Sequence, residues 1–330
     1  MSGTPRLLDV AQAAGVSLRT ASRVLNDDPR VAPETRQRVQ AAMAELRFQP
    51  DEIARTLRAG TDTAIGFVVE SIADPFFAEV IDAVEQEMSH QGRSVLVTST
   101  RRDPGRERDV IGRMTQRRIS GLLLVPTGAD HSWLDTAPVP VVLVDRPAPG
   151  LSADLVEIDD HRAALDATAH LIGHGHRRIA YVGDTPAIPT SAARLRGYRD
   201  ALARHGIEAD ESLVNSDSAT SQDAALAVSA IVRGTRPPTA ILSASTRTSL
   251  GVVPALHSAG RTDIALVSFG DFPMADSLRP AVTVVDHPAY EIGRTAAARL
   301  LARLAKPGLP AERIQVPVKI IERGSGELRP

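Results

Sequence analysis

Side chains suited to reading a DNA sequence gather in a short stretch near the N-terminus. A helix would place four residues near one face, at spacings i, i+1, i+4 and i+5, and these are Leu18, Arg19, Ser22 and Arg23. Its other face would carry Ala21, Val24 and Leu25. An arginine fork fits the two acceptors of a guanine edge in the major groove, and leucine fits a thymine methyl group. The same spacing is typical of the solvated face of a small helical domain, so both interpretations stay open.

The elements that would position this stretch are three short helical patterns without a strand between them, LLDVAQAA, SLRTASRVLN and PETRQRVQAAMAELRF. Gly15 suits the turn before the second pattern, and Ser17 suits its N-cap. A helix, a tight turn and a second helix therefore follow one another, as in DNA-binding helix-turn-helix units. The segment PDEIARTLRAG, residues 50–60, is bounded by Pro and Gly and fits either a linker or a further helix.

From about residue 64 onward, short β-branched runs alternate with helical patterns. The runs are AIGFVVE, SVLVTST, GLLLVP, PVVLVD, DLVEID, RIAYVG, TAILSAS, IALVSFG, AVTVVD and RIQVPVKII. Such alternation predicts parallel sheets with helices on both faces, and roughly 270 residues suit two doubly wound lobes better than one. Ligands in folds of this class bind at the carboxyl ends of the strands, often between lobes.

Composition narrows the class of protein. With 330 residues, the chain is long enough for about two domains. The absence of cysteine excludes a disulfide framework, a thiolate metal site and a cysteine nucleophile. No run reaches the roughly 18 apolar residues of a membrane span, and the N-terminus has no apolar signal core, so we expect a cytoplasmic protein. The net charge is −2, with residues 1–60 slightly basic, which permits a nucleic-acid partner without establishing one.

Motifs of common enzyme classes are missing from the sequence. The stretch GHGHRRI lies before a strand and lacks the third glycine of a dinucleotide fingerprint, and neither H-E-x-x-H nor G-x-S-x-G occurs. His174 and His176 fit surface or strand-entry positions better than a metal site. We therefore predict no catalytic residue, no metal and no cofactor. A solute receptor that does not bind DNA stays an alternative, although such a protein would need an export signal.

The order of motifs along the chain resembles the lactose repressor and galactose repressor (LacI/GalR) family. DVAQAAGVSLRTASRVLN, VAPETRQRVQAAMAEL and FQPDEIARTLRAGTDTAIGFVV look like a headpiece, third helix and hinge. The likeness continues through HGHRRIAYVGD, SAARLRGYRDAL and SFGDFPMAD to IIERGSGELRP. It implies an all-α helix-turn-helix headpiece over residues 1–49, a hinge over residues 50–60, and a periplasmic-binding-protein-like core of two doubly wound lobes over residues 61–330. It also implies a transcriptional repressor that binds a pseudo-palindromic operator as a homodimer, with a small-molecule effector in the interlobe cleft.

The resemblance assigns DNA contacts residue by residue. The positions that match base-reading residues are Leu18, Arg19 and Arg23. Backbone contacts map to Thr20, Ser22, Asn26 and Arg30. The hinge residues that match entry into the minor groove are Ala54, Leu57 and Arg58, and Leu57 would be the wedge that unstacks the central base step.

Positions lining the effector cleft of relatives are matched by Asp74, Phe77, Asp145, Arg146, Thr190, Arg194, Ser245 and Asp271. We expect Arg194 to contact the ligand directly, because a guanidinium fork pairs with carboxylates, phosphates or adjacent hydroxyls; a salt bridge that stabilises one lobe is the alternative. The sequence departs from many sugar-binding relatives at Ser245, Thr246 and Gly270. Together with the arginines Arg101, Arg146, Arg194 and Arg247, these departures suggest a phosphorylated or acidic sugar as a hypothesis beside a plain sugar.

Overall fold

The computed structural model describes residues 5–25, 28–48 and 64–330. The chain divides into two units, Met1–Asp62 and Thr63–Pro330, called here the N-terminal unit and the core unit. The proposed hinge over residues 50–60, with Ala54, Leu57 and Arg58, lies outside the described residues, and so does Asn26.

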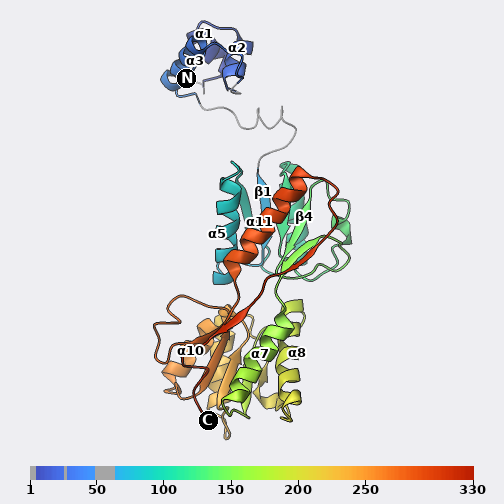
Figure 1. Cartoon of the computed structure of the whole chain (residues 1–330), viewed down its shortest axis with the longest axis vertical. Coiled ribbons are helices and arrows are strands. Elements are labelled where there is room, and N and C mark those ends of the chain that lie inside the picture. The colour runs from blue at the N-terminus through green and yellow to red at the C-terminus, as the bar shows by residue number, and fades with distance from the viewer. Residues whose placement is uncertain (1–4, 26–27, 49–63) are drawn as a thin grey trace. The chain divides into compact units, whose positions relative to one another are not determined.

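The N-terminal unit is helical, as its sequence predicts. It contains α1 (Leu7–Ala13), α2 (Leu18–Leu25) and α3 (Pro33–Glu45) (Figure 1). The hydroxyl of Ser17 accepts a hydrogen bond of 3.1 Å from the Thr20 backbone N–H and so caps α2. Gly15 turns the chain between α1 and α2 with a φ of 64°, a conformation that favours glycine. The three helices enclose a small apolar core of Val10, Ala11, Ala14, Ala21, Val24, Val39 and Ala42.

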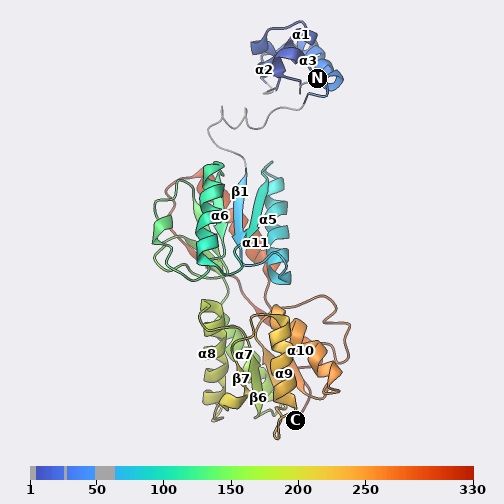
Figure 2. The same ribbon diagram turned by 180° about the vertical axis from the view of Figure 1, so that it is seen from behind.

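The first lobe of the core unit is a sheet covered on both faces by helices. Its strand order is β11-β5-β4-β3-β1-β2. The strands are β1 (Ile65–Val69), β2 (Val95–Ser99), β3 (Gly121–Leu124), β4 (Val141–Val144), β5 (Asp154–Glu157) and β11 (Arg313–Gln315). On one face lie α5 (Pro75–Ser89) and α11 (Ala289–Ala305), and on the other lies α6 (Pro104–Gln116) (Figures 1 and 2).

The second lobe repeats this plan with the order β12-β10-β9-β8-β6-β7. The strands are β6 (Ile179–Val182), β7 (Val214–Asn215), β8 (Ala240–Ser243), β9 (Ala265–Phe269), β10 (Thr283–Asp286) and β12 (Lys319–Ile321). The helices pack in pairs, α7 (Asp160–Gly173) with α8 (Pro189–Arg204), and α9 (Ser221–Val232) with α10 (Thr246–Ser258). Short 3₁₀ turns cover Ser132–Leu134 in the first lobe and Glu211–Leu213 in the second.

These two lobes confirm the predicted doubly wound architecture. Neighbouring strands run parallel in both sheets, except that β12 pairs antiparallel with β10. One predicted run, RIQVPVKII, is divided: its first part is β11 in the first lobe and its second part is β12 in the second lobe. The chain also passes between the lobes after β5 and after β10, so three segments connect the two lobes. Within the described residues, each helix falls short of the length and apolarity that a membrane crossing requires.

Candidate functional site

The outer face of α2 presents the side chains expected to read DNA. Leu18 is 49% exposed although it is apolar, and Arg19 and Arg23 are exposed beside it. On the inner face, Ala21 and Val24 are buried in the core of the N-terminal unit. The helical spacing therefore separated the two faces at these positions, whereas Ser22 and Leu25 are both half-buried; the roles assigned to the outer residues stay predictions.

Asp28 holds the arginines that flank the end of α2. Its carboxylate accepts hydrogen bonds from Arg30 Nε at 2.9 Å and Arg30 Nη2 at 2.8 Å, and it lies 3.7 Å from Arg23 Nε. The hydrogen bonds from Arg30 lower the pKa of Asp28 to about 2, so the carboxylate stays charged at neutral pH. Arg30, predicted to contact the DNA backbone, and Arg23, predicted to read a base, thus share one acidic partner.

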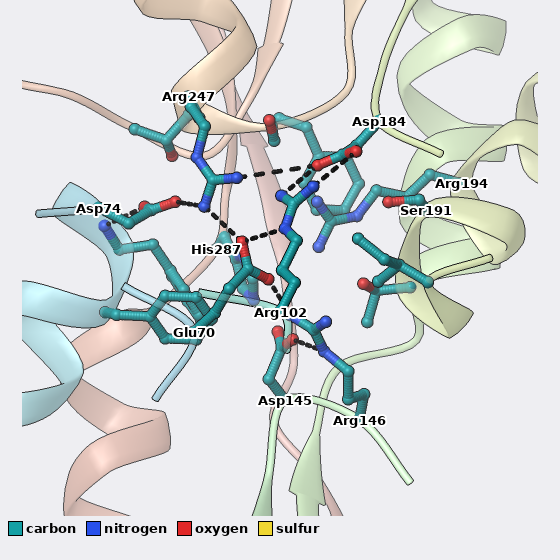
Figure 3. Close-up of a pocket in the computed structure, with 17 residues that line it drawn as sticks. Glu70, Asp74, Arg102, Asp145, Arg146, Asp184, Ser191, Arg194, Arg247 and His287 are labelled. Carbon is teal, nitrogen blue, oxygen red and sulfur yellow. Dashed lines mark hydrogen bonds and ion pairs between the residues drawn. The ribbon is translucent and has the colours of Figure 1, made fainter. Parts of the chain in front are cut away.

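A second group of functional side chains lies where the two lobes of the core unit meet. Titratable residues directly follow the carboxyl ends of three strands there: Glu70 follows β1, Asp145 follows β4, and His287 follows β10. Asp184 and Ser245 come within two residues of the ends of β6 and β8. The side chains converge on one cavity between the lobes, which has a volume of about 60 Å³ (Figure 3). Carboxyl ends of parallel strands are the usual place for a ligand site in such sheets.

The structure brings together most of the predicted effector residues. Those that line the cavity are Asp74, Phe77, Asp145, Arg146, Thr190, Arg194 and Ser245. Asp271 is not among these lining residues: its carboxylate accepts a hydrogen bond of 2.9 Å from Arg323 Nη1, and it lines a neighbouring opening of about 660 Å³. Arg101, grouped with the cleft arginines in the sequence, is exposed outside the cavity, and its neighbour Arg102 lines it instead.

Sequence reasoning missed several lining residues. They include Glu70, Phe76, Arg102, Asp184, Ser191, Phe269 and His287. For Glu70 and His287 a signal was present, since Glu70 ends one predicted strand run and His287 directly follows another. Arg102 carries no such signal, because its direction depends on the backbone: Arg101 and Arg102 have φ of 56° and 65°, which is unusual for residues with a side chain.

Opposite charges form a closed ring across the cavity. In the first lobe, Arg102 Nε donates to Glu70 at 2.7 Å, and across the cleft Arg102 Nη1 donates to Asp184 at 2.9 Å. From the second lobe, Arg247 Nη2 donates back to Glu70 at 2.7 Å, and its Nη1 lies 3.8 Å from Asp184. We call Glu70, Arg102, Asp184 and Arg247 the ion-pair ring (Figure 3).

Three further charged residues support the ion-pair ring. Arg247 also donates to Asp74 at 2.6 Å, and Arg146 donates to Glu70 at 3.3 Å and to Asp145 at 2.9 Å. Burial alone would raise the pKa of Glu70, but the surrounding guanidinium groups lower it to about 2. Glu70 is therefore ionised, and it is the acidic centre of the site.

Arg194 lies at one side of the cavity with partners of its own. It donates from Nε to Asp160 at 2.7 Å and from Nη1 to the backbone oxygen of Ala244 at 2.8 Å, and its guanidinium lies 3.9 Å from the centre of the Phe269 ring. Arg194 therefore forms the salt bridge within the second lobe that was the alternative. It also lines the cavity, and its contact with a ligand stays a prediction.

His287 contributes a polar atom without a partner among the described residues. Its ring stacks on Phe76, with the two ring centres 4.0 Å apart, and meets Phe269 edge-on at 5.8 Å. The Nε2 atom is buried and has no hydrogen bond in this part of the chain. Burial lowers the pKa of His287 well below its usual value, and the charge of Arg194 adds to the effect, so the ring is neutral. The Nε2 atom of a neutral imidazole can donate a hydrogen bond to a bound molecule or accept one from it, depending on the tautomer.

Comparisons with known proteins place the chain in a family. Residues 6–51 match the model of bacterial regulatory proteins of the lacI family, and residues 168–326 match a periplasmic binding protein-like domain. The transcriptional regulator GalR of Escherichia coli K12 is 32% identical over 309 residues, which are 92% of this chain and 90% of GalR. The chain belongs to the LacI family.

Other LacI-family relatives match over nearly their whole length. The ribose operon repressor of Escherichia coli K12 is 30% identical over 326 residues, 96% of this chain and 98% of that protein. A solved structure of the transcriptional regulator CelR in complex with cellobiose superimposes with a TM-score of 0.71 at 28% identity, covering 97% of this chain and 99% of CelR. Both the headpiece and the core are therefore shared with regulators of this family.

Within this LacI-family core, the departures at Thr246 and Gly270 have a common local reason. Gly270 adopts a φ of 92°, and a Cβ atom there would collide with the hydroxyl of Thr246. That hydroxyl in turn lies 3.4 Å from the Asp271 backbone oxygen. Thr246 and Gly270 therefore fit each other, so the two departures act as one local change at the edge of the cavity.

Proposed function

We propose that this LacI-family regulator represses transcription by binding a pseudo-palindromic operator as a homodimer in the cytoplasm. The observation that carries the proposal is the outer face of α2, where Leu18, Arg19 and Arg23 stand exposed over a buried inner face. One helix-turn-helix unit reads one half-site, and two-fold symmetry of the protein then implies two-fold symmetry of the operator. The family relationship, including the ribose operon repressor, supports the repressor role.

Roles on the DNA follow from side-chain chemistry. Arg19 and Arg23 have the donor fork that pairs with guanine, and Leu18 has the apolar surface that suits a thymine methyl group. Thr20, Ser22 and Arg30 would contact phosphates, and such contacts set the register and the salt dependence of binding without reading sequence. Asp28 would keep Arg30 in place, because it holds the guanidinium through two hydrogen bonds.

The core unit would bind a small polar effector between its lobes. We propose an uncharged polyhydroxylated ligand, because each of the four guanidinium groups lining the cavity already contacts a carboxylate: Arg102, Arg146, Arg194 and Arg247. An anion would have to compete with those carboxylates, whereas hydroxyl groups can both give and accept hydrogen bonds. CelR, which shares this fold, is solved with a disaccharide, cellobiose. The regulators related to this chain are not enzymes by name, and we propose no catalytic role.

Selection of bound fragments from random duplex DNA tests the DNA-binding role. We expect inverted repeats, and we expect Arg23→Ala to weaken binding to the selected site by about 1–3 kcal/mol while affecting bulk DNA less. Arg38→Ala, an exposed arginine on α3, is the matched control and should leave the preference between sequences unchanged. A chain that stays monomeric and prefers no inverted repeat over competitor DNA would contradict the proposal and favour a solute receptor.

Titration calorimetry with matched neutral and phosphorylated sugars tests the effector class. We expect the neutral member of a pair to bind at least as tightly as the phosphorylated one, because the cavity arginines are already neutralised. Consistently tighter binding of the phosphorylated members would instead support the anionic hypothesis that the arginine content suggested.

A further inference from the structure

The cleft is closed in the structure by the protein's own side chains. Its cavity has a volume of about 60 Å³, which is room for only a few water molecules. Pockets that hold small organic ligands are typically about 300–1,000 Å³. Within this cavity, the charged groups of the ion-pair ring therefore leave less space than an effector needs. Two larger openings, of about 610 and 660 Å³, flank it between the lobes.

Two contacts of the ion-pair ring join the lobes, and they point in opposite directions. Arg102 reaches from the first lobe to Asp184 in the second through two hydrogen bonds, one of them 2.9 Å long. Arg247 reaches from the second lobe to Glu70 and Asp74 in the first, at 2.7 and 2.6 Å. Arg102 also contacts Glu70, and Arg247 also lies close to Asp184. Each arginine therefore contacts both acids, and the four residues form a ring instead of two separate bridges (Figure 3).

Partial burial gives these ion pairs more weight than surface pairs have. The side chains of Glu70 and Asp184 are 7% and 11% exposed, and those of Arg102 and Arg247 are 26% and 21% exposed. Salt and water screen such pairs less than they screen exposed ones. Removing one arginine would leave acidic groups of both lobes facing each other without their common partner, which favours separation of the lobes.

Contacts outside the ion-pair ring agree with a closed arrangement. Gly128, after β3 in the first lobe, has a φ of 94° and lies so close to Ala187 of the second lobe that a Cβ atom would be 3.7 Å from the Ala187 oxygen. Helix α10 of the second lobe likewise meets α5 of the first. Contacts between the lobes thus extend beyond the charged groups.

We propose that the ion-pair ring of Glu70, Arg102, Asp184 and Arg247 is an internal latch that holds the two lobes against each other, so that an effector entering this cavity has to displace its contacts. This inference rests on one part of the proposed function, namely that the effector binds in the cleft between the lobes. A ligand would have to replace the hydrogen bonds of the arginines and of Glu70, and binding and closure would therefore oppose each other.

Distance measurements between the lobes test the latch in the full chain. The sequence has no cysteine, so Asp109→Cys on α6 and Arg196→Cys on α8, both exposed, accept spin labels at two defined places. Labelled chain diluted with excess unlabelled chain confines the measured distances to one molecule. Without any added ligand, we expect one narrow distribution of distances between the two labels in the protein that carries only these two substitutions.

Substitution of a latch arginine should open the cleft. Arg247→Gln should give a longer and broader distance distribution, whereas Arg261→Gln should not, because Arg261 pairs locally with Asp263 inside the second lobe at 2.9 Å. A narrow, unchanged distribution in Arg247→Gln would overturn the latch, and so would a broad distribution before any substitution. If circular dichroism shows that Arg247→Gln is unfolded, Asp184→Asn removes the second-lobe acid that contacts both arginines and is read in the same way.

Operator binding separates failure of the latch from failure of the proposed function. If lobe position is coupled to DNA affinity, Arg247→Gln should change the affinity for the selected operator about 5-fold or more without an effector, in the range usual for coupled sites. Opening of the lobes without any change in operator affinity would support the latch and contradict the coupling. Opening in a chain that binds no operator would support the latch and contradict the proposed function.

Discussion

Arg194 and Asp160 form an ion pair of 2.7 Å inside the second lobe, where each side chain is less than a tenth exposed. Asp160 is the first residue of α7 and Arg194 lies on α8, so the pair fastens the start of one helix to the other. Arg194 also reaches the end of β8 through its hydrogen bond to Ala244. The arginine that the sequence marked as an effector contact therefore also holds the wall of the cavity together.

Replacing Arg194 should destabilise the core unit. Arg194→Ala removes one partner of a buried pair and leaves Asp160 without its cation, which should cost about 3–5 kcal/mol above pH 7, where Asp160 is ionised, and less at lower pH. Arg199→Ala is the matched control on the same helix, because the pair of Arg199 with Glu211 is exposed and should be worth at most about 1 kcal/mol. Chemical unfolding followed by circular dichroism measures both, and equal losses in the two variants would contradict the structural role of Arg194.

Asp160 should make stability fall as the pH rises. Burial raises the pKa of Asp160 to about 7; Arg194 opposes the rise and Asp145 adds to it. The folded chain therefore holds a proton that the unfolded chain has already released, so this contribution to the free energy of unfolding is complete below about pH 4 and is lost as the pH rises through about 7. Asp160→Asn should show a smaller loss of stability between pH 5 and pH 8. Parallel pH profiles of the two proteins would contradict the assignment.

His131 and Glu107 should give the first lobe a different pH dependence. Both ring nitrogens of His131 face acceptors, the Ala129 carbonyl and the Glu107 carboxylate, each at 2.6 Å, so the ring carries a proton on both. Burial would lower the pKa of His131, but the hydrogen bond and charge of Glu107 raise it above its usual 6.5. The pair therefore stabilises the fold below pH 6.5, and this stability is lost as the pH rises through the raised pKa.

Glu107→Gln tests this pair through a built-in reporter. The variant should lose more stability at pH 6 than at pH 9, because the charged pair exists mainly at the lower pH. Trp133, the single tryptophan of the chain, lies 6.4 Å from His131 between ring centres, so its fluorescence follows the same titration. His161→Gln is the control, since the pair of His161 with Asp200 is largely exposed. Equal losses at both pH values would show that the pair is not charged.

Gly197 should tolerate no side chain on α8. Its backbone lies against α7, where a Cβ atom would collide with the His161 oxygen and lie 3.0 Å from the Leu165 nitrogen. Gly197→Ala should therefore destabilise the core unit by about 1–3 kcal/mol. Gly173→Ala is the control, because a Cβ atom there meets no heavy atom within 4 Å, and it should be neutral or stabilise by up to about 1 kcal/mol. Thermal unfolding of both variants compares them directly.

Regular periodicity allowed much of the architecture to be predicted from the sequence. The period of a helix alone puts Ala21 and Val24 on one face of α2 and Arg19 and Arg23 on the other, because successive residues turn by a constant angle. Alternating strand and helix patterns likewise predicted two parallel-sheet lobes. The short β7, and the division of one apolar run into β11 and β12, were not predicted, since two or three residues carry no measurable period.

The sequence predicted only some of the residues that line the cavity. Glu70, Asp271 and His287 all come within two residues of a strand end, yet Glu70 and His287 line the cavity while Asp271 pairs with Arg323. Arg101 and Arg102 are identical in type and adjacent, yet only the second lines the cavity. In both cases the direction of the side chain depends on local backbone conformation and on which partner is in reach.

What the sequence by itself determined about this protein was its type: a cysteine-free helix-turn-helix regulator with a two-lobed core. Only the tertiary structure decided that Glu70, Arg102, Asp184 and Arg247 meet in one ring. These residues are far apart along the chain, and strand order and the closure of one lobe on the other bring them together. Local propensity extends over a few residues, whereas a charge finds its partner through the packing of the whole core.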